Sequence, residues 1–399
     1  MRVWIVNPFD NLPLEGNRPQ RYWLMARAFA RAGHEVTFWT SDFSHAHKAP
    51  RAFVSDEAVK LNGRAAGPDV WQVDGFRLVL IPTPPYRRNI SFVRIFSHRA
   101  LARRWTARVA AEQPPDVVIA SSPPLGLCAA ARDYCAAHRI PFVVDVMDAW
   151  PETFQRVVPK FVLAPLARTA RANYCAARGI SVVAARYLDL VRTYGATAPT
   201  RLFYHGIACT DGSDVPPPRP RGERLTLVYA GNMSASYDLA TLITAVKETP
   251  DLVLELAGTG PDETALRALA ANSPRIHFHG YLAETPLRAL LARADAGVVP
   301  MFGASCVGVP YKLADYAAAG LPILNSLEGE TAQLIAEYQA GETYTAGSVA
   351  SFIAAVARLR TLDPVPLQAG ARCLATRFDA TTVYGEYVAW IVDLVHCAR

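Results

Sequence analysis

The chain has 399 residues, of which 51% are hydrophobic and 19% are charged. That length suffices for two or three domains of about 150 residues each, and the composition excludes a disordered or fibrous protein. No run of about eighteen uninterrupted apolar residues occurs, and the first strand-like segment turns polar at Asn7. The sequence therefore predicts neither a transmembrane helix nor a signal peptide, and we expect a cytoplasmic protein.

The charge is distributed unevenly along the chain. Residues Met1–Val215 carry 27 lysines and arginines against 17 acidic residues, whereas the remainder carries 14 against 18. The seven cysteines form no Cys-x-x-Cys pair, so neither a disulfide framework nor a zinc site is indicated. We expect free thiols and no metal cofactor.

Short apolar runs alternate with helical periodicity, the pattern of βαβ units and a parallel sheet. In the first half the expected strands are Arg2–Val6, Glu35–Thr40, Phe76–Ile81, Val117–Ala120, Phe142–Val146 and Ser181–Ala184. In the second half they are Leu225–Tyr229, Leu252–Ala257, Ile276–His279, Ala296–Val299 and Ile323–Asn325. Between the halves, a segment with four prolines in residues 211–222 predicts a linker.

The pattern predicts an α/β protein with two Rossmann-like domains. We expect a first domain over residues 1–210, a linker over 211–224, a second domain over 225–375 and a closing segment over 376–399. Within that segment, apolar residues at helical spacing predict a helix over Thr381–Ala398 that returns to the first domain. Two such domains are expected to face a cleft, with ligands at the carboxyl ends of their strands.

Glycine-rich turns follow two expected strands of the second domain. Gly231-Asn232 comes after the first strand, and Gly258-Thr-Gly260 comes after the next. Glycine lets backbone amides face a phosphate at a strand end, although an ordinary strand-to-helix turn explains so short a match equally well. The third glycine of a dinucleotide fingerprint is missing after Gly260, which argues against NAD.

A third glycine-containing turn, Val307-Gly308-Val309-Pro310, leads into an expected helix that carries Lys312 and Asp315. Free amides, a positive helix end and a lysine together suit a diphosphate, and Asp315 suits ribose hydroxyls. The alternative is a surface lysine paired with an aspartate three residues later, which contributes only a few tenths of a kcal/mol.

Candidate groups in the first domain lie in two loops. Asp148 and Glu152 follow a strand, where a carboxylate can accept a proton or orient a hydroxyl; a helix-capping role is the alternative for Asp148. Gly16-Asn17-Arg18 forms a loop after the first strand. His45 and His47 have no further metal-ligating residues at the spacing of a metal site, and we interpret them as loop histidines.

In their order along the chain, these segments resemble the GT-B glycosyltransferases, specifically glycosyltransferase family 4 and its subgroup that builds bacterial surface polysaccharides on polyprenyl diphosphate carriers. The matching segments are Gly16-Asn-Arg-Pro19, Gly33-His-Glu-Val-Thr37, Asp148-Ala-Trp-Pro-Glu152, His205-Gly-Ile207, Gly231-Asn232, Gly258-Thr-Gly260 and Pro310-Tyr-Lys-Leu-Ala-Asp315. Together they extend over nearly the whole chain.

The resemblance implies a retaining transfer from a nucleotide-diphosphate sugar, with a UDP-sugar the expected donor and a lipid-linked or small-molecule acceptor. It implies donor contacts from Gly231, Asn232, Gly258, Gly260, Val307, Gly308, Lys312, Asp315 and Glu330, and acceptor contacts from Gly16, Asn17, Arg18 and Glu152. Asp148 and Lys312 are the implied catalytic residues, without a metal.

The chain departs from the family pattern at two places. Asp315 matches the second acidic residue of the family's Glu-x7-Glu motif, but the first falls on Val307. The basic residues that usually follow the Gly231 turn are also missing, so Lys312 becomes the main cation for the diphosphate. Two rivals therefore stay open, namely a sugar-nucleotide epimerase of the same fold and a noncatalytic partner that binds nucleotide sugars.

The stretch Tyr86–Arg108 contains seven arginines and no acidic residue, with the apolar residues Ile90, Phe92, Ile95, Phe96, Leu101 and Trp105 between them. This composition is typical of a helix at an anionic membrane surface. A helix packed on its own domain is the alternative. We therefore hypothesise peripheral attachment to the inner face of the cytoplasmic membrane, and no binding of nucleic acid.

Overall fold

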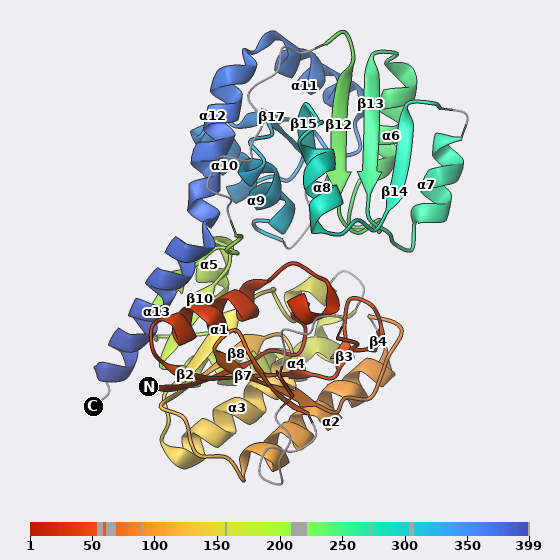
Figure 1. Ribbon diagram of the computed structural model, residues 1–399. Coiled ribbons are helices and arrows are strands. Elements are labelled where there is room, and N and C mark those ends of the chain that lie inside the picture. Colours follow the sequence, from red (N-terminus) through yellow and green to blue (C-terminus); the bar gives the residue numbers. More distant parts are fainter. Residues whose placement is uncertain are drawn as a thin grey trace. The chain divides into compact units, whose positions relative to one another are not determined.

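The computed structural model describes residues 1–53, 59–60, 69–89, 91–155, 158–208, 222–271, 273–302 and 307–397 (Figure 1). The chain divides into two compact units. Unit 1 comprises Met1–Gly206 and Ala380–Arg399, and unit 2 comprises Ile207–Asp379. Most of the predicted linker, residues 211–221, lies outside the described residues.

Unit 1 alternates strands and helices along most of its length. Its strands are β1 (Arg2–Val6), β2 (Glu35–Ser41), β3 (Phe43–Ser44), β4 (Ala49–Pro50), β5 (Val59–Lys60), β6 (Val70–Val73), β7 (Phe76–Ile81), β8 (Val117–Ser122), β9 (Phe142–Val146), β10 (Gly179–Val182) and β11 (Thr200–Leu202). Its helices are η1 (Pro13–Glu15), α1 (Arg21–Arg31), α2 (Phe92–Val109), α3 (Leu125–His138), η2 (Glu152–Phe154), α4 (Lys160–Ala176), α5 (Arg186–Thr193) and α13 (Ala380–His396).

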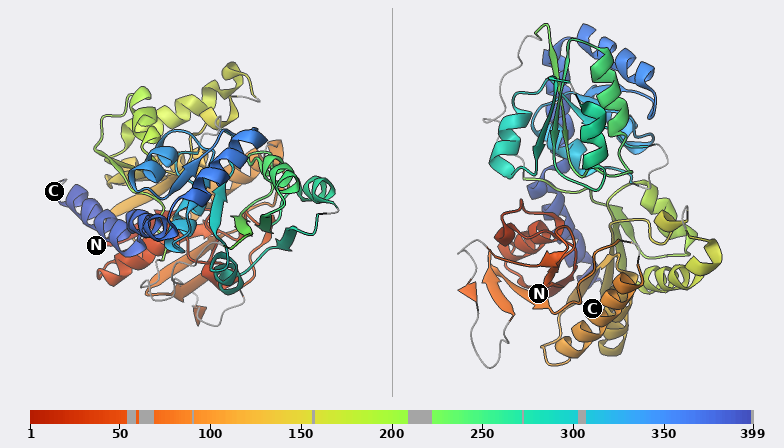
Figure 2. Two further views of the ribbon diagram at one scale, coloured as in Figure 1. Left: turned by 90° about the horizontal axis from the view of Figure 1, so that it is seen from above. Right: turned by 90° about the vertical axis from the view of Figure 1, so that its right-hand side faces the viewer.

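The main sheet of unit 1 has the strand order β11-β10-β9-β8-β1-β2-β7-β6-β5 in the described residues. Pairing is parallel from β11 to β7 and antiparallel at β7-β6-β5. Helices α1 and α13 pack together on one face, and α2, α3 and α4 pack in sequence on the other (Figures 1 and 2). Because both faces are covered, the central strands are buried along their whole length, as in β8 and β9.

A buried ion pair connects the elements of unit 1. The Arg21 guanidinium donates to both carboxylate oxygens of Asp145 at 2.8 Å, and both side chains are fully buried. Burial alone raises the pKa of Asp145, but the Arg21 charge and hydrogen bonds from Arg21, Ser181 and Tyr22 hold it below its usual value. Ser181 also bonds the Tyr387 hydroxyl at 3.0 Å. The network thus joins α1, β9 and β10 to the returning helix α13.

Unit 2 repeats the alternation. Its strands are β12 (Leu225–Ala230), β13 (Leu252–Ala257), β14 (Ile276–Gly280), β15 (Ala296–Val299), β16 (Ile323–Asn325) and β17 (Gly341–Thr343). Its helices are α6 (Leu239–Glu248), α7 (Glu263–Ala270), α8 (Glu284–Leu291), α9 (Tyr311–Ala318), α10 (Glu330–Glu337), α11 (Val349–Thr361), α12 (Pro364–Ala375) and η3 (Thr376–Phe378).

The sheet of unit 2 is parallel, with the order β14-β13-β12-β15-β16-β17. Its core is formed by apolar side chains of the strands and of α6 and α11, such as Leu227, Leu254 and Phe352. Strand order reverses between β12 and β15, because β13 lies on one side of β12 and β15 lies on the other. The carboxyl ends of these two strands mark the crevice where open α/β sheets bind ligands.

The expected α/β fold with two Rossmann-like domains is confirmed. The strands predicted at Phe76–Ile81, Phe142–Val146 and Leu252–Ala257 have those bounds in the structure. The strand predicted at Ser181–Ala184 lies two residues earlier, because Gly179 already pairs with β9. The closing helix begins at Ala380 and packs on α1, as part of unit 1. In the described part of the chain no helix is long and apolar enough to cross a bilayer.

Candidate functional site

The turns after β12 and β13 pack against each other in unit 2. Gly231 donates its amide to the Ala257 carbonyl at 2.9 Å, and Met233 donates to the Thr259 carbonyl at 3.0 Å. Gly258 has a φ of +122°, and a Cβ on it would lie 1.9 Å from the Gly231 oxygen. A Cβ on Gly260 would lie 2.1 Å from the Met233 oxygen. These glycines are therefore required for the close approach of the two backbones, whatever they bind.

Lys312 lies beside this turn. A Cβ on Gly231 would meet the Lys312 Nζ at 3.4 Å, and Nζ lies 3.7 Å from the centre of the Tyr237 ring and 5.0 Å from that of Tyr229. The residue is only 6% exposed, so the interpretation of Lys312 as a surface lysine is wrong. Within the described residues its ammonium donates no hydrogen bond.

The surroundings of Lys312 disfavour its positive charge. Burial lowers the pKa of the ammonium to about 7, although the negative charge of Asp315 opposes this shift. The faces of Tyr229 and Tyr237 attract a cation but supply no counter-charge. A group that is buried, cationic and without a hydrogen-bonding anion is the arrangement expected where an anionic ligand completes the site.

Of the remaining predicted donor residues, Asn232 lies in the turn after β12, and the others lie on the two segments after β15 and β16. Gly308 precedes α9, and its carbonyl accepts a hydrogen bond from the Thr331 hydroxyl at 2.7 Å. Because Glu330 begins α10 immediately before Thr331, this bond brings the first turn of α10 to the Val307-Gly308 turn. Asp315 lies within α9. Asn232 is exposed, and its carbonyl accepts from the Tyr229 hydroxyl at 2.5 Å.

In unit 1, Asp148 uses its carboxylate to hold its own loop. One oxygen accepts from the Ala149 amide at 2.8 Å and the Thr153 hydroxyl at 3.1 Å, and the other accepts from the Trp150 indole at 3.2 Å. Burial raises the pKa of Asp148, while these hydrogen bonds oppose the shift. Asp148 does not cap the next helix, because Pro151 takes the cap position of η2.

The two carboxylate oxygens of Glu152 differ in their hydrogen bonds. Its Oε1 accepts a short hydrogen bond from the Tyr194 hydroxyl, whereas its buried Oε2 has no partner within the described residues. An orphaned buried carboxylate oxygen is costly unless a ligand or water satisfies it. Glu152 can therefore accept a hydrogen bond from a substrate hydroxyl.

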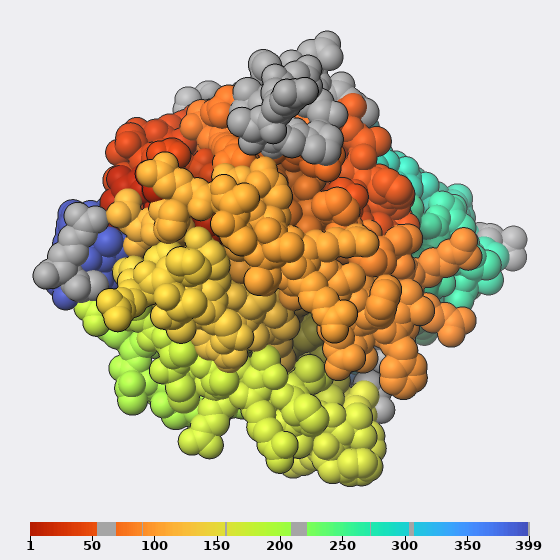
Figure 3. Space-filling view, turned by 90° about the horizontal axis from the view of Figure 1, so that it is seen from below, coloured from red at the N-terminus to blue at the C-terminus, as the bar shows by residue number. Residues whose placement is uncertain are grey.

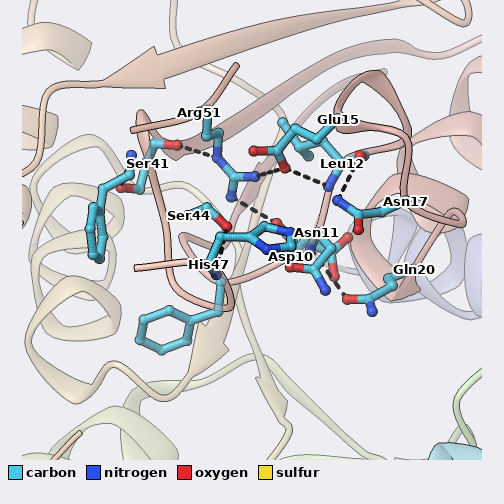
Figure 4. A network of polar contacts seen from close by, with 12 residues as sticks. Asp10, Asn11, Leu12, Glu15, Asn17, Gln20, Ser41, Ser44, His47 and Arg51 are labelled. Carbon is cyan, nitrogen blue, oxygen red and sulfur yellow. Dashed lines mark hydrogen bonds and ion pairs between the residues drawn. The ribbon is translucent and has the colours of Figure 1, made fainter. Parts of the chain in front are cut away.

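The loop with Gly16, Asn17 and Arg18 is fixed at its base (Figure 4). Arg51 forms an ion pair with Glu15 at 2.6 Å and donates to the Asp10 carbonyl at 2.7 Å. Asn17 donates to the Leu12 carbonyl at 3.4 Å, and Gly16 has a φ of +76°. These contacts hold the loop at the carboxyl end of β1, the position predicted from the sequence. Arg18 in this loop is partly exposed.

The stretch Tyr86–Arg108 contains helix α2 (Phe92–Val109), which buries one face and exposes apolar side chains elsewhere. In α2, Leu101 and Trp105 are buried in the domain, while Phe92 and Phe96 are 89% and 62% exposed. Arg94 is not on the surface but buried. It lies with His45 and His98 in a cluster that sequence analysis missed, because it interpreted His45 as a loop histidine and Arg94 as one of seven surface cations.

Two family models match the chain. Residues 20–208 match the Glycosyl transferase 4-like domain, and residues 224–361 match Glycosyl transferases group 1. A glycogen synthase of Mycobacterium tuberculosis H37Rv is 31% identical over 184 residues, which cover 41% of this chain and 42% of that protein. The chain thus spans less than half the length of this relative.

Solved structures share the fold over the full chain. A sucrose-phosphate synthase of Thermosynechococcus elongatus superposes with a TM-score of 0.74 at 12% identity and covers 99% of both chains. The HepE protein of Anabaena, solved with UDP and glucose, has a TM-score of 0.63 at 13% identity and covers 98% of this chain and 99% of its own. The chain thus shares the fold of two Rossmann-like units with these structures, and it joins a segment that matches the Glycosyl transferase 4-like domain to one that matches Glycosyl transferases group 1.

Proposed function

We propose that the protein is a retaining glycosyltransferase, which moves a hexosyl or N-acetylhexosaminyl group from a UDP-sugar in unit 2 to a lipid-linked diphosphate acceptor in unit 1. The observation that carries the proposal is the buried Lys312 ammonium beside the Gly231 turn, at the point where strand order reverses. The two glycosyltransferase domains support the reaction class, and the UDP bound to HepE supports the donor.

The chemistry follows from where charge develops. As the bond between the sugar C1 and the diphosphate oxygen breaks, its electron pair moves onto the leaving diphosphate. Lys312 and the backbone amides of the Val307-Gly308 turn stabilise that charge more in the transition state than in the ground state. The acceptor oxygen attacks C1 from the same face, and its proton passes to the leaving diphosphate, so neither a metal nor a protein nucleophile is required.

The other residues of unit 2 bind the donor in this proposal. Asp315 accepts hydrogen bonds from the ribose, while Glu330 and the backbone of Val307 bind the sugar in place of the missing acidic side chain. Asn232, Gly258 and Gly260 shape the turn around the diphosphate.

In unit 1 the acceptor is held by the Gly16-Asn17-Arg18 loop and by the free Glu152 oxygen. Asp148 acts as a positioning residue, because all its described hydrogen bonds go to the loop that carries Trp150 and Glu152.

An exposed surface supports a lipid-linked acceptor. Helix α2 exposes Phe92, Val93, Ile95 and Phe96, and the first turns of α4 expose Phe161, Val162 and Leu166. Arg87, Arg88, Arg99 and Arg103 are exposed next to the first set. Figure 3 shows the face on which α2 (orange) and α4 (yellow-green) both reach the surface. Apolar side chains flanked by arginines suit the boundary of an anionic membrane.

The test is donor turnover by the purified protein with a panel of UDP-sugars and polyprenyl diphosphate-linked acceptors, with products identified by mass spectrometry. Lys312→Met is expected to lower kcat by about 10²-fold with a smaller effect on KM. Lys247→Met is the matched control, because Lys247 is exposed on α6. An epimerised free UDP-sugar as the product would identify the epimerase alternative, and UDP binding without turnover would identify a noncatalytic protein.

A further inference from the structure

Four basic side chains gather at the carboxyl edge of the sheet in unit 1. His45 and Lys48 follow β3, while Arg94 and His98 lie on the first two turns of α2. Tyr86, which follows β7, and Trp150, which follows β9, pack among them. The cluster therefore draws on segments more than 100 residues apart in the chain.

Hydrogen bonds determine which protons the cluster carries. Lys48 Nζ lies 3.2 Å from His45 Nδ1 and 2.6 Å from the Asn89 amide oxygen. Arg94 Nε donates to His98 Nε2 at 3.4 Å, and Arg94 Nη1 donates to the Asn89 carbonyl at 2.7 Å. Since lysine and arginine only donate, His45 Nδ1 and His98 Nε2 are acceptors, and each neutral ring carries its proton on the other nitrogen.

The cluster has little counter-charge of its own. In the described part of the chain, neither Lys48 nor Arg94 forms an ion pair with a carboxylate. The negative charge that acts on Arg94 from Asp148 belongs to a carboxylate already hydrogen-bonded within its own loop. Arg94 instead hydrogen-bonds the Tyr86 side chain and packs against the ring of Trp150 at 4.9 Å. These neutral partners attract a cation but do not neutralise it.

The electrostatic consequences agree with this geometry. Burial and the positive charges of Lys48 and Arg94 lower the pKa of His45 and of His98 to about 3. Burial and the charge of Arg94 lower the pKa of Lys48 to about 8. The buried Arg94 guanidinium and the partly exposed Lys48 ammonium repel each other, and an anion bound between them relieves that repulsion.

We propose that His45, Lys48, Arg94 and His98 form a site for a phosphoryl group of the acceptor. This site rests on the proposed transferase function and extends it. It specifies that the acceptor carries a phosphate or diphosphate and is not an uncharged sugar. A phosphoryl group accepts several hydrogen bonds at once, which suits the Arg94 guanidinium, the Lys48 ammonium and the two imidazole N–H groups. The phosphoryl group belongs either to a polyprenyl diphosphate or to a water-soluble sugar phosphate.

The test is calorimetric titration of the full chain with inorganic pyrophosphate, for the wild type, Arg94→Gln, Lys48→Met and Lys312→Met. Arg31→Gln is the matched control, because Arg31 is an exposed arginine on α1, outside the cluster. We expect Arg94→Gln and Lys48→Met each to weaken binding about tenfold or more, and Arg31→Gln to leave it unchanged. Lys48 is partly exposed, so Lys48→Met remains informative where Arg94→Gln loses stability.

A second readout is the titration of the His45 and His98 rings by NMR. Bound pyrophosphate is expected to raise the pKa of both, because it opposes the repulsion from Arg94 and Lys48. Sedimentation with phosphatidylcholine vesicles, with and without polyprenyl phosphate, distinguishes the two sources. Wild-type binding that depends on the polyprenyl phosphate and is lost in Lys48→Met identifies the lipid, while pyrophosphate binding alone identifies a soluble phosphate.

Equal pyrophosphate affinity in the wild type, Arg94→Gln and Lys48→Met would overturn the proposal. So would binding that is lost only in Lys312→Met, which would place pyrophosphate in unit 2. UDP titrations of the same samples separate the two proposals. One outcome would support this site and refute the proposed function: pyrophosphate binds and the binding depends on Arg94, but the protein neither binds UDP nor turns over a UDP-sugar.

Discussion

The two units share a fold type but use charge differently. Unit 1 buries the Arg21–Asp145 ion pair completely, and nearly does so with Arg51–Glu15. In the described residues of unit 2, each ion pair has at least one partner that is 31% exposed or more. Lys312 of unit 2 is only 6% exposed, and it forms no ion pair with any residue that the structure describes. The two buried ion pairs of unit 1 therefore connect elements of its fold, whereas the buried Lys312 of unit 2, like Arg94 of unit 1, forms no ion pair within the described residues.

The difference extends to the candidate sites. The site in unit 2 is built from backbone turns that only glycine permits, with one cation beside them. The cluster in unit 1 is built from long side chains, two of them cationic and two of them neutral imidazoles. Substitutions of the glycines in unit 2 should therefore act through the backbone, whereas substitutions of Lys312 and of the cluster in unit 1 should act through electrostatics.

The largest effect is expected where a buried pair is broken. Asp145→Asn leaves the Arg21 guanidinium buried without its anion, so the free energy of unfolding should fall by about 3–5 kcal/mol. Urea denaturation of the full chain measures it. Asp133→Asn is the control, because Asp133 is 68% exposed in its ion pair with Arg132 and should change stability by less than about 1 kcal/mol. Equal effects would show that the Arg21–Asp145 pair does not hold unit 1 together.

The next largest effect is expected from a substitution that disturbs the backbone contact between the two glycine turns of unit 2. Gly258→Ala places a Cβ on the Gly231 oxygen at a φ that L-residues avoid, so stability should fall by about 2–4 kcal/mol. Gly385→Ala is the control within α13, where a Cβ meets nothing within 4 Å and should stabilise by about 0.5–1 kcal/mol. An unaffected Gly258→Ala melting curve would contradict the close approach of the two turns.

The pH dependence of UDP binding sharpens the role of Lys312. With a pKa of about 7 in the free protein, Lys312 is charged below that pH and neutral above it, while the bound diphosphate favours the charged form. Affinity should therefore fall between pH 7.5 and 9.5, approaching about tenfold per pH unit, in a range above the phosphate's own titration near pH 6. Calorimetry at several pH values measures this. The Lys312→Met profile should be flat, and a flat wild-type profile would remove Lys312 from the diphosphate.

The smallest effect is expected at the exposed surface of α2. Arg99→Gln removes one cation beside Phe92 and Phe96 and should weaken binding to anionic vesicles about fivefold, with less difference at high salt. Arg31→Gln is the control, because Arg31 is exposed on α1, on the opposite face of the sheet. Equal loss in both variants would mean that net charge, and not the α2 surface, attracts the protein to the membrane.

Much of the fold could be predicted from the sequence, because the signals are local. Apolar runs such as Phe142–Val146 are buried on both faces of a parallel sheet, and their length determines the strand. The short strands β11 and β17 were missed, because Thr200–Leu202 and Gly341–Thr343 are too short and too polar to stand out. The turns at Gly231 and Gly258 could also be recognised from the local sequence, because glycines follow an apolar run. The contact between the two turns could not be predicted from the sequence.

What the sequence determined by itself was the identity and chain position of the chemical groups: the glycines at strand ends, a lysine at the start of a helix, and arginines along α2. Tertiary structure decided their surroundings. It enclosed Lys312 between Tyr229 and Tyr237, and it turned Arg94 inward to meet His98 and Trp150. Helical periodicity assigns a residue to a face but not to a partner. Parallel strands bring loops from distant parts of the chain to one edge of the sheet, where contacts between them determine burial and charge.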